Sequence, residues 1–154
     1  MTTFTVKHIL VPHDFSDAAG RATSLALDLA EKMGARVTLL HVYDVSYGFP
    51  EGAALTVQMA REFETAARTA LDGVASRTRR QGVEVMSLLR QGTPWRVIGD
   101  VAKESSVDLI VMGTQGRRGL ARWMLGSTAE RVVRTAPCPV LTVHGPDGAK
   151  QDPA

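Results

Sequence analysis

The sequence lacks the features typical of a secreted, disulfide-stabilised or membrane-spanning protein. Its 154 residues include one cysteine, Cys138, so no disulfide can form within the chain, and we expect a buried, inert thiol in a reducing compartment. No apolar run approaches the roughly 18 residues of a membrane helix, and the N-terminus shows neither region of a signal peptide. We therefore expect a cytoplasmic protein with no membrane partner.

An excess of charge of either sign is also absent. The formal net charge is +2, and no block of about five or six like charges occurs, which argues against a nucleic-acid partner but leaves small acidic ligands open. The hydrophobic content of 44% and charged content of 22% are ordinary for a globular protein. We expect a single domain over residues 1–145, followed by a mobile C-terminal tail over residues 146–154.

Short apolar runs alternate with amphipathic segments along the whole chain. Five runs predict strands, at Lys7 to Pro12, Arg36 to Val42, Glu84 to Leu89, Asp108 to Met112 and Val140 to Val143. A first helix is predicted over residues 18–33, with an inner face at Ala18, Ala22, Leu25, Leu29 and Met33. A second is predicted over residues 53–81, with an inner face at Leu55, Met59, Phe63, Ala66, Ala70 and Val74.

Terminating and capping residues support these helices. Gly34 and Gly82 stand where the first two helices should end. Thr93 is expected to cap a third helix that has Pro94 in its first position, and Ile98, Val101 and Ala102 should form its inner face. Alternating strands and helices favour a parallel sheet with helices on both faces.

Three segments far apart in sequence should meet at one edge of this sheet. The loop with Asp14, the end of the strand at Val42 and the loop with Gly113 all follow carboxyl ends of strands. Ligands of such sheets bind beyond these ends, where the strand order reverses. Asp14 could instead cap the first helix, but Ser16 and Asp17 are better placed for that role, so we interpret Asp14 as a ligand contact.

A glycine framework follows the fourth strand. Gly113, Gly116 and Gly126 lead to a helix that opens on Ser127 and Thr128 and ends before Pro137. Glycines permit positive φ or a close approach to a ligand, and the helix N-terminus attracts an anion, most simply a phosphate chain. That N-terminus alone contributes only about 0.3 to 1 kcal/mol, so the loop cannot be the whole site. Cationic side chains that could complete the charge match, or form a solvated basic loop, are Arg117, Arg118 and Arg122.

The spacing Gly113-x2-Gly116-x9-Gly126-Ser127 resembles the ATP-binding pattern of the universal stress protein family, and the resemblance extends from HILVPHDFSD to CPVLTV. It implies a five-stranded parallel sheet of order 3-2-1-4-5 with helices on both faces, a Rossmann-like fold akin to that of the adenine nucleotide alpha hydrolases. Asp14 would then face the ribose and phosphates, and Val42 would meet adenine through its backbone. The phosphates would be held by Gly113, Gly116, Gly126 and Ser127. Neighbours that complete the expected set are Pro12, Met112, Arg117, Arg118 and Thr128.

The resemblance also implies a homodimer that pairs its last strands, Val140 to Val143, and a nucleotide-dependent role in stress response or signalling, with Mg²⁺ held by the phosphates of ATP. Two alternatives stay open: a slow ATPase, and a dimeric adaptor without nucleotide. No GxxxxGK[ST] pattern occurs, and only Asp14 or His13 could activate a water. His13 departs from the family pattern, and we interpret it as a structural hydrogen-bonding residue. A phosphate contact below a pKa of about 6.5 is the alternative for it.

Overall fold

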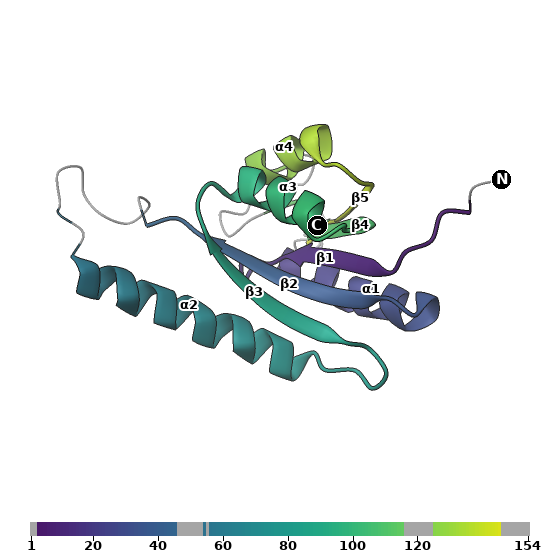
Figure 1. Ribbon diagram of the computed structural model, residues 1–154, viewed down its shortest axis with the longest axis horizontal. Helices are drawn as coiled ribbons and strands as arrows, with labels where there is room; N and C mark the ends of the chain where they lie inside the picture. Colours follow the sequence, from purple (N-terminus) through teal and green to yellow (C-terminus); the bar gives the residue numbers. More distant parts are fainter. Residues whose placement is uncertain (1–2, 46–53, 55, 116–124, 146–154) are drawn as a thin grey trace, which may run out of the picture.

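The computed structural model describes residues 3–45, 54, 56–115 and 125–145 of the chain. Within these residues strands and helices alternate (Figure 1), as the sequence predicts. The elements are β1 (His8–Pro12), α1 (Asp17–Met33), β2 (Arg36–Tyr43), α2 (Val57–Arg77), β3 (Val85–Gln91), α3 (Pro94–Glu104), β4 (Leu109–Gly113), α4 (Ser127–Thr135) and β5 (Val140–Val143).

The strands form one parallel sheet in the order β3-β2-β1-β4-β5, which confirms the expected order. β1 lies in the middle, where Ile9 pairs with Val37 of β2 on one side and with Leu109 of β4 on the other. The chain leaves β1 toward β2 and later returns past it to β4, so the strand order reverses between β1 and β4. In a doubly wound sheet, the crevice for a ligand opens at that reversal.

Helices cover both faces of the sheet, as expected (Figure 1). Because successive side chains of a strand point to opposite faces, Val11 joins a core with α1 and α2, whereas Leu10 joins a core with α3 and α4. The two cores carry most of the buried apolar area, the dominant favourable term in folding. None of the helices in the described ranges is both long and apolar enough to cross a bilayer.

The inner face of α1 is made of smaller side chains than we predicted. Met33 is 50% exposed, and Leu25 and Leu29 lie only at the edge of the core. The prediction is confirmed at Ala18 and Ala22, which are buried. The other buried residues of α1 are Ala19, Thr23, Ala26, Leu27 and Ala30. The methyl side chain of alanine is too short to hold the helix away from the strands, so α1 approaches the sheet closely. The predicted stop is confirmed, since Gly34 ends the helix with φ 68.

The second helix is shorter than the predicted range 53–81. It begins after Thr56, whose side chain accepts a hydrogen bond from the N–H of Met59, and it ends at Arg77. Gly82, with φ 82, belongs to the turn that follows and does not end the helix. The predicted inner face was mostly wrong, because only the C-terminal half of α2 packs closely on the sheet, where Leu71 and Val74 are buried. The predicted residues that are exposed are Met59, Phe63, Ala66 and Ala70, and Leu55 lies outside the described residues.

The inner face predicted for α3 is confirmed, since Ile98, Val101 and Ala102 are buried. Pro94 occupies the first turn and Thr93 the capping position, but the Thr93 side chain makes no capping hydrogen bond. The predicted tail, residues 146–154, lies outside the described residues. A single domain over residues 1–145 stays a prediction.

Candidate functional site

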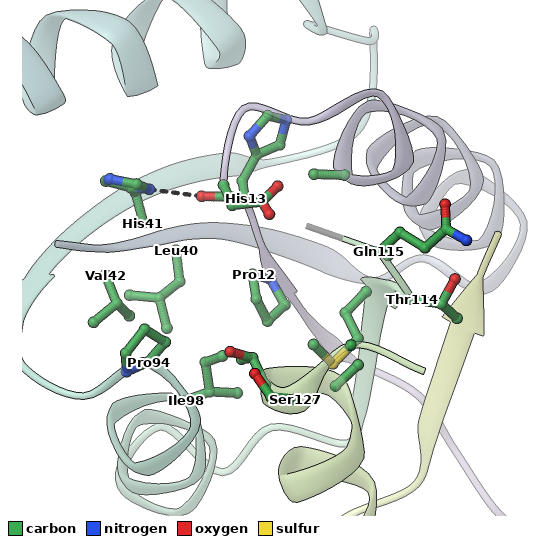
Figure 2. A pocket seen from close by; sticks show the side chains of 17 residues that line it. Pro12, His13, Leu40, His41, Val42, Pro94, Ile98, Thr114, Gln115 and Ser127 are labelled. Atoms are coloured by element: carbon green, nitrogen blue, oxygen red, sulfur yellow. Dashed lines mark hydrogen bonds between the residues drawn. The ribbon is translucent and has the colours of Figure 1, made fainter. Parts of the chain in front are cut away.

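The carboxyl ends of β1, β2 and β4 surround one pocket of about 400 Å³ (Figure 2). This volume lies within the range of small-molecule sites, roughly 300 to 1,000 Å³. The residues singled out in the sequence that line it are Pro12, Asp14, Val42, Met112, Gly113, Gly126, Ser127 and Thr128. Gly116, Arg117 and Arg118 lie outside the described residues, so their role stays a prediction.

One wall of the pocket is apolar and includes residues that we did not single out. Leu40 and Val42 project from β2 toward α3, where Pro94 and Ile98 face them (Figure 2). The sequence placed Pro94 and Ile98 correctly on α3, but it suggested only structural roles for them. The sequence could have indicated their place in the pocket, because α3 begins shortly after the carboxyl end of β3, at the edge of the sheet where ligands bind. Such a wall suits a planar apolar group.

Another part of the pocket wall is the N-terminus of α4. Ser127, Thr128 and Ala129 line it, and the N–H groups of a first turn have no acceptor further back in their own helix. The N-cap is Gly126, and α4 begins at Ser127, which confirms the predicted start of the helix. The backbone N–H of Gly126 donates to the carbonyl of Thr114 at 2.7 Å, which fixes the start of α4 beside the end of β4. The helix therefore presents donors and a positive dipole end to the pocket.

Gly113 is required for packing. Neither Gly113 nor Gly126 has a positive φ, so of the two expected reasons for these glycines the positive φ was wrong, whereas a close approach to a ligand stays a prediction. A Cβ on Gly113 would lie 2.8 Å from the Cβ of Ala18 and 2.9 Å from its carbonyl carbon. Glycine at this position lets the start of α1 lie directly against the end of β4. The close approach therefore brings two walls of the pocket together.

Asp14 lies at the rim of the pocket and also organises its own loop. Its Oδ1 accepts hydrogen bonds from the backbone N–H and the hydroxyl of Ser16. Ser16 in turn caps α1, because its Oγ accepts from the N–H of Ala19 at 3.2 Å. Asp14 is therefore not the cap, in agreement with the sequence argument.

His13 is buried beside the pocket in a cluster of rings. Its Nδ1 accepts the N–H of Phe15 at 3.0 Å, which supports our interpretation of a hydrogen-bonding residue. Burial lowers the pKa of His13, partly offset by the nearby Asp14 carboxylate. Near neutral pH, His13 is therefore cationic less often than an ordinary histidine, which makes an ionic contact with phosphate less favourable. The ring of Phe15 lies 5.4 Å from that of His13 and 4.5 Å from that of His41.

A second buried histidine, His8, lies at the opposite edge of the sheet. Its Nε2 is 2.8 Å from the hydroxyl of Thr38, and its Nδ1 is 3.2 Å from the carbonyl oxygen of Ser105. The same Nδ1 also lies 3.3 Å from Nη2 of Arg36, which only donates. Burial lowers the pKa of His8. These contacts fit a structural role for His8.

Other candidate side chains lie away from the pocket. Tyr43 ends β2 and packs with the core under α1 and α2, so it does not line the pocket. Trp95 contacts two guanidinium groups, those of Arg96 at 5.2 Å and Arg131 at 5.3 Å from its ring centre. Cys138 is half-buried, less than we expected, and burial raises the pKa of its thiol, which fits an inert group. The residues outside the described ranges include Arg122, together with Tyr47, Trp123 and Met124.

Comparison with known sequences places this architecture in a defined family. The family model that matches is that of the universal stress protein family, over residues 5–144. A universal stress protein from Methanocaldococcus jannaschii is 38% identical over 144 residues, covering 91% of this chain and 83% of its own length. One from Thermus aquaticus is 35% identical over 139 residues, covering 90% and 98%.

Solved structures show the same fold. A universal stress protein from Lactobacillus plantarum superposes with a TM-score of 0.68 at 30% identity, covering 90% of this chain and 98% of its own. A family member from Burkholderia pseudomallei gives 0.70 at 30% identity, with coverage of 90% and 96%. Two more distant structures, each 24% identical, are complexes with cAMP and, from Archaeoglobus fulgidus, with dAMP, and at that identity they show the fold alone.

Proposed function

The chain belongs to the universal stress protein family, and from that premise we propose that it binds ATP in the pocket at the carboxyl edge of the sheet. The observation that supports this most strongly is the arrangement of the pocket. An apolar wall and a helix N-terminus both line one cavity of about 400 Å³. A nucleotide has matching ends, a planar base and a phosphate chain.

The base lies against the apolar wall and the phosphates at α4. Val42 meets adenine through its backbone, and Asp14 faces the ribose and phosphates. The phosphates lie at Gly113, Gly126 and Ser127. The site is completed by Pro12, Met112, Gly116, Arg117, Arg118 and Thr128. The N–H groups at the start of α4 support this orientation, because they favour negative charge.

Mg²⁺ accompanies the ATP in this proposal and is held mainly by the phosphates. Among the described residues that line the pocket, Asp14 has the only carboxylate. In the same part of the chain, no group of three or more His, Cys, Asp or Glu side chains could hold a metal ion. Magnesium usually keeps several waters and binds one or two carboxylates plus substrate phosphates, so this donor set fits the metal bound with a nucleotide.

The same proposal includes a cytoplasmic homodimer that acts as a nucleotide-dependent stress-response or signalling module. β5 is an edge strand of the sheet, and Leu141 on it is 37% exposed. An open apolar edge favours pairing with another strand, here β5 of a second copy.

Titration calorimetry tests the ATP site, with one variant that fills the pocket. We expect wild-type protein to bind ATP and Val42→Trp to bind at least about tenfold more weakly, because the larger side chain occupies the apolar wall. The matched control is Met86→Trp on β3, a position that is 52% exposed and does not line the pocket. Equal loss of affinity in both variants, or no binding by folded wild-type protein, would contradict the proposal.

Thermal unfolding separates a nucleotide-binding module from an adaptor without nucleotide. ATP at a hundred times its Kd should stabilise the folded state by about 2.7 kcal/mol, which for this size of domain raises Tm by roughly 5 to 10 °C. cAMP and dAMP serve as comparison ligands, chosen from the two distant complexes. An unchanged Tm with every nucleotide would favour the adaptor.

A further inference from the structure

The loop that carries Asp14 is held in place by β2. The N–H of His13 donates to the carbonyl of Leu40 at 2.8 Å, which continues the sheet by one residue. The ring of His41 then adds a side-chain contact, because its Nδ1 lies 2.7 Å from the carbonyl oxygen of His13 (Figure 2). A carbonyl only accepts, so the Nδ1 of His41 carries the hydrogen and donates.

The same loop contains an unfavourable backbone conformation. Phe15 has φ 65, in the left-handed region, where a bulky aromatic residue is rare. Its N–H donates to Nδ1 of His13, and its ring lies 4.5 Å from the ring of His41. Such strain persists only when the surroundings hold it, and it occurs often at ligand sites.

We propose that His41 is a positioning residue for the nucleotide pocket, which holds the peptide between His13 and Asp14 in the orientation that presents Asp14 to the ligand. The inference rests on the proposed function. His41 also lines the pocket at its rim. Because a peptide unit is planar, the direction of the His13 carbonyl also sets the direction from which the chain enters Asp14.

Two substitutions of His41 separate the hydrogen bond from the bulk of the ring. His41→Leu keeps apolar bulk against Phe15 but removes the donor, and we expect ATP affinity to fall about three- to tenfold, the value of one hydrogen bond. His41→Asn places an amide N–H close to the position of Nδ1, and we expect it to restore most of the lost affinity. Circular dichroism and Tm establish that each variant is folded.

A double-mutant cycle with Asp14→Asn shows whether His41 acts through Asp14. We expect His41→Leu to weaken ATP binding in the wild-type background and to add little in the Asp14→Asn background, since the carboxylate it positions is already gone. The effects of the two substitutions on Tm should combine more nearly additively. A purely structural role for His41 would leave its effect on Kd the same in both backgrounds.

A histidine substitution at the far edge of the sheet controls for lost stability. His8→Asn alters a buried histidine that does not line the pocket, and it should lower Tm without changing the Kd for ATP. Unchanged Kd in folded His41→Leu, no recovery in His41→Asn, or an additive cycle would each overturn the inference. Absence of ATP binding by the wild-type protein would instead overturn the proposed function on which it rests.

Discussion

Replacing Gly113 with alanine should destabilise the fold, because the new methyl group has no space. Its position would be 2.8 Å from the Cβ of Ala18 and 2.9 Å from the carbonyl carbon of the same residue, both closer than carbon atoms tolerate. The second contact is with backbone at the start of α1, which cannot move away as a flexible side chain can. Overpacking of this kind typically costs about 1 to 3 kcal/mol, which corresponds to a fall in Tm of roughly 2 to 12 °C for a domain of this size.

Urea unfolding measures this cost, and a second glycine provides a control of opposite sign. Gly20 lies within α1, and a Cβ there would meet nothing within 4 Å. Gly20→Ala should therefore stabilise the protein by about 0.5 to 1 kcal/mol through helix propensity. Ala18→Gly combined with Gly113→Ala should recover only part of the loss, because the backbone contact remains. An unchanged unfolding midpoint for Gly113→Ala would refute the packing argument.

Three further predictions concern pH, capping and assembly. Burial lowers the pKa values of His8 and His13, so the stability they contribute is present above the unfolded value of about 6.5 and is lost as pH falls below it. Urea midpoints at several pH values should show this slope, and His8→Gln should reduce it. Ser16→Ala should lower the free energy of unfolding by about 1 kcal/mol, because it removes the cap of α1. Thr93→Ala should lower it little, because the Thr93 side chain makes no capping hydrogen bond. Equal urea midpoints for the two variants would contradict this. Leu141→Lys on β5 should convert the dimer to a monomer in light scattering, and a dimer that persists would contradict pairing through β5.

The sequence predicted the fold well because the pattern of strands is a local property. Runs such as the one at Leu109 are short, apolar and bounded by turn residues, and the alternation with helices then limits the topology. The order of the strands followed from the family resemblance, and it is confirmed. The buried faces of the helices were less predictable. Met33 and Phe63 fit the apolar spacing of their helices, but both lie beyond the part of each helix that the sheet covers, so they are exposed.

The pocket was only partly predictable for a related reason. Residues at strand ends, such as Asp14 and Val42, are visible from the position of the strands. Pro94 and Ile98 come from α3, and they reach the pocket only through the packing of that helix on β2. The role of Gly113 was also hidden, because a contact with Ala18 is a tertiary feature with no local signal.

The position of the bound base tests the central claim most directly. Photolabelling with an azido-adenine analogue of ATP, followed by mass spectrometry of the peptides, identifies what lies beside the base. The account predicts labelled peptides that contain Val42 or the start of α3 at Pro94, with the label displaced by unmodified ATP. Labelling confined to other segments, such as α2, and equally displaced by ATP would contradict it.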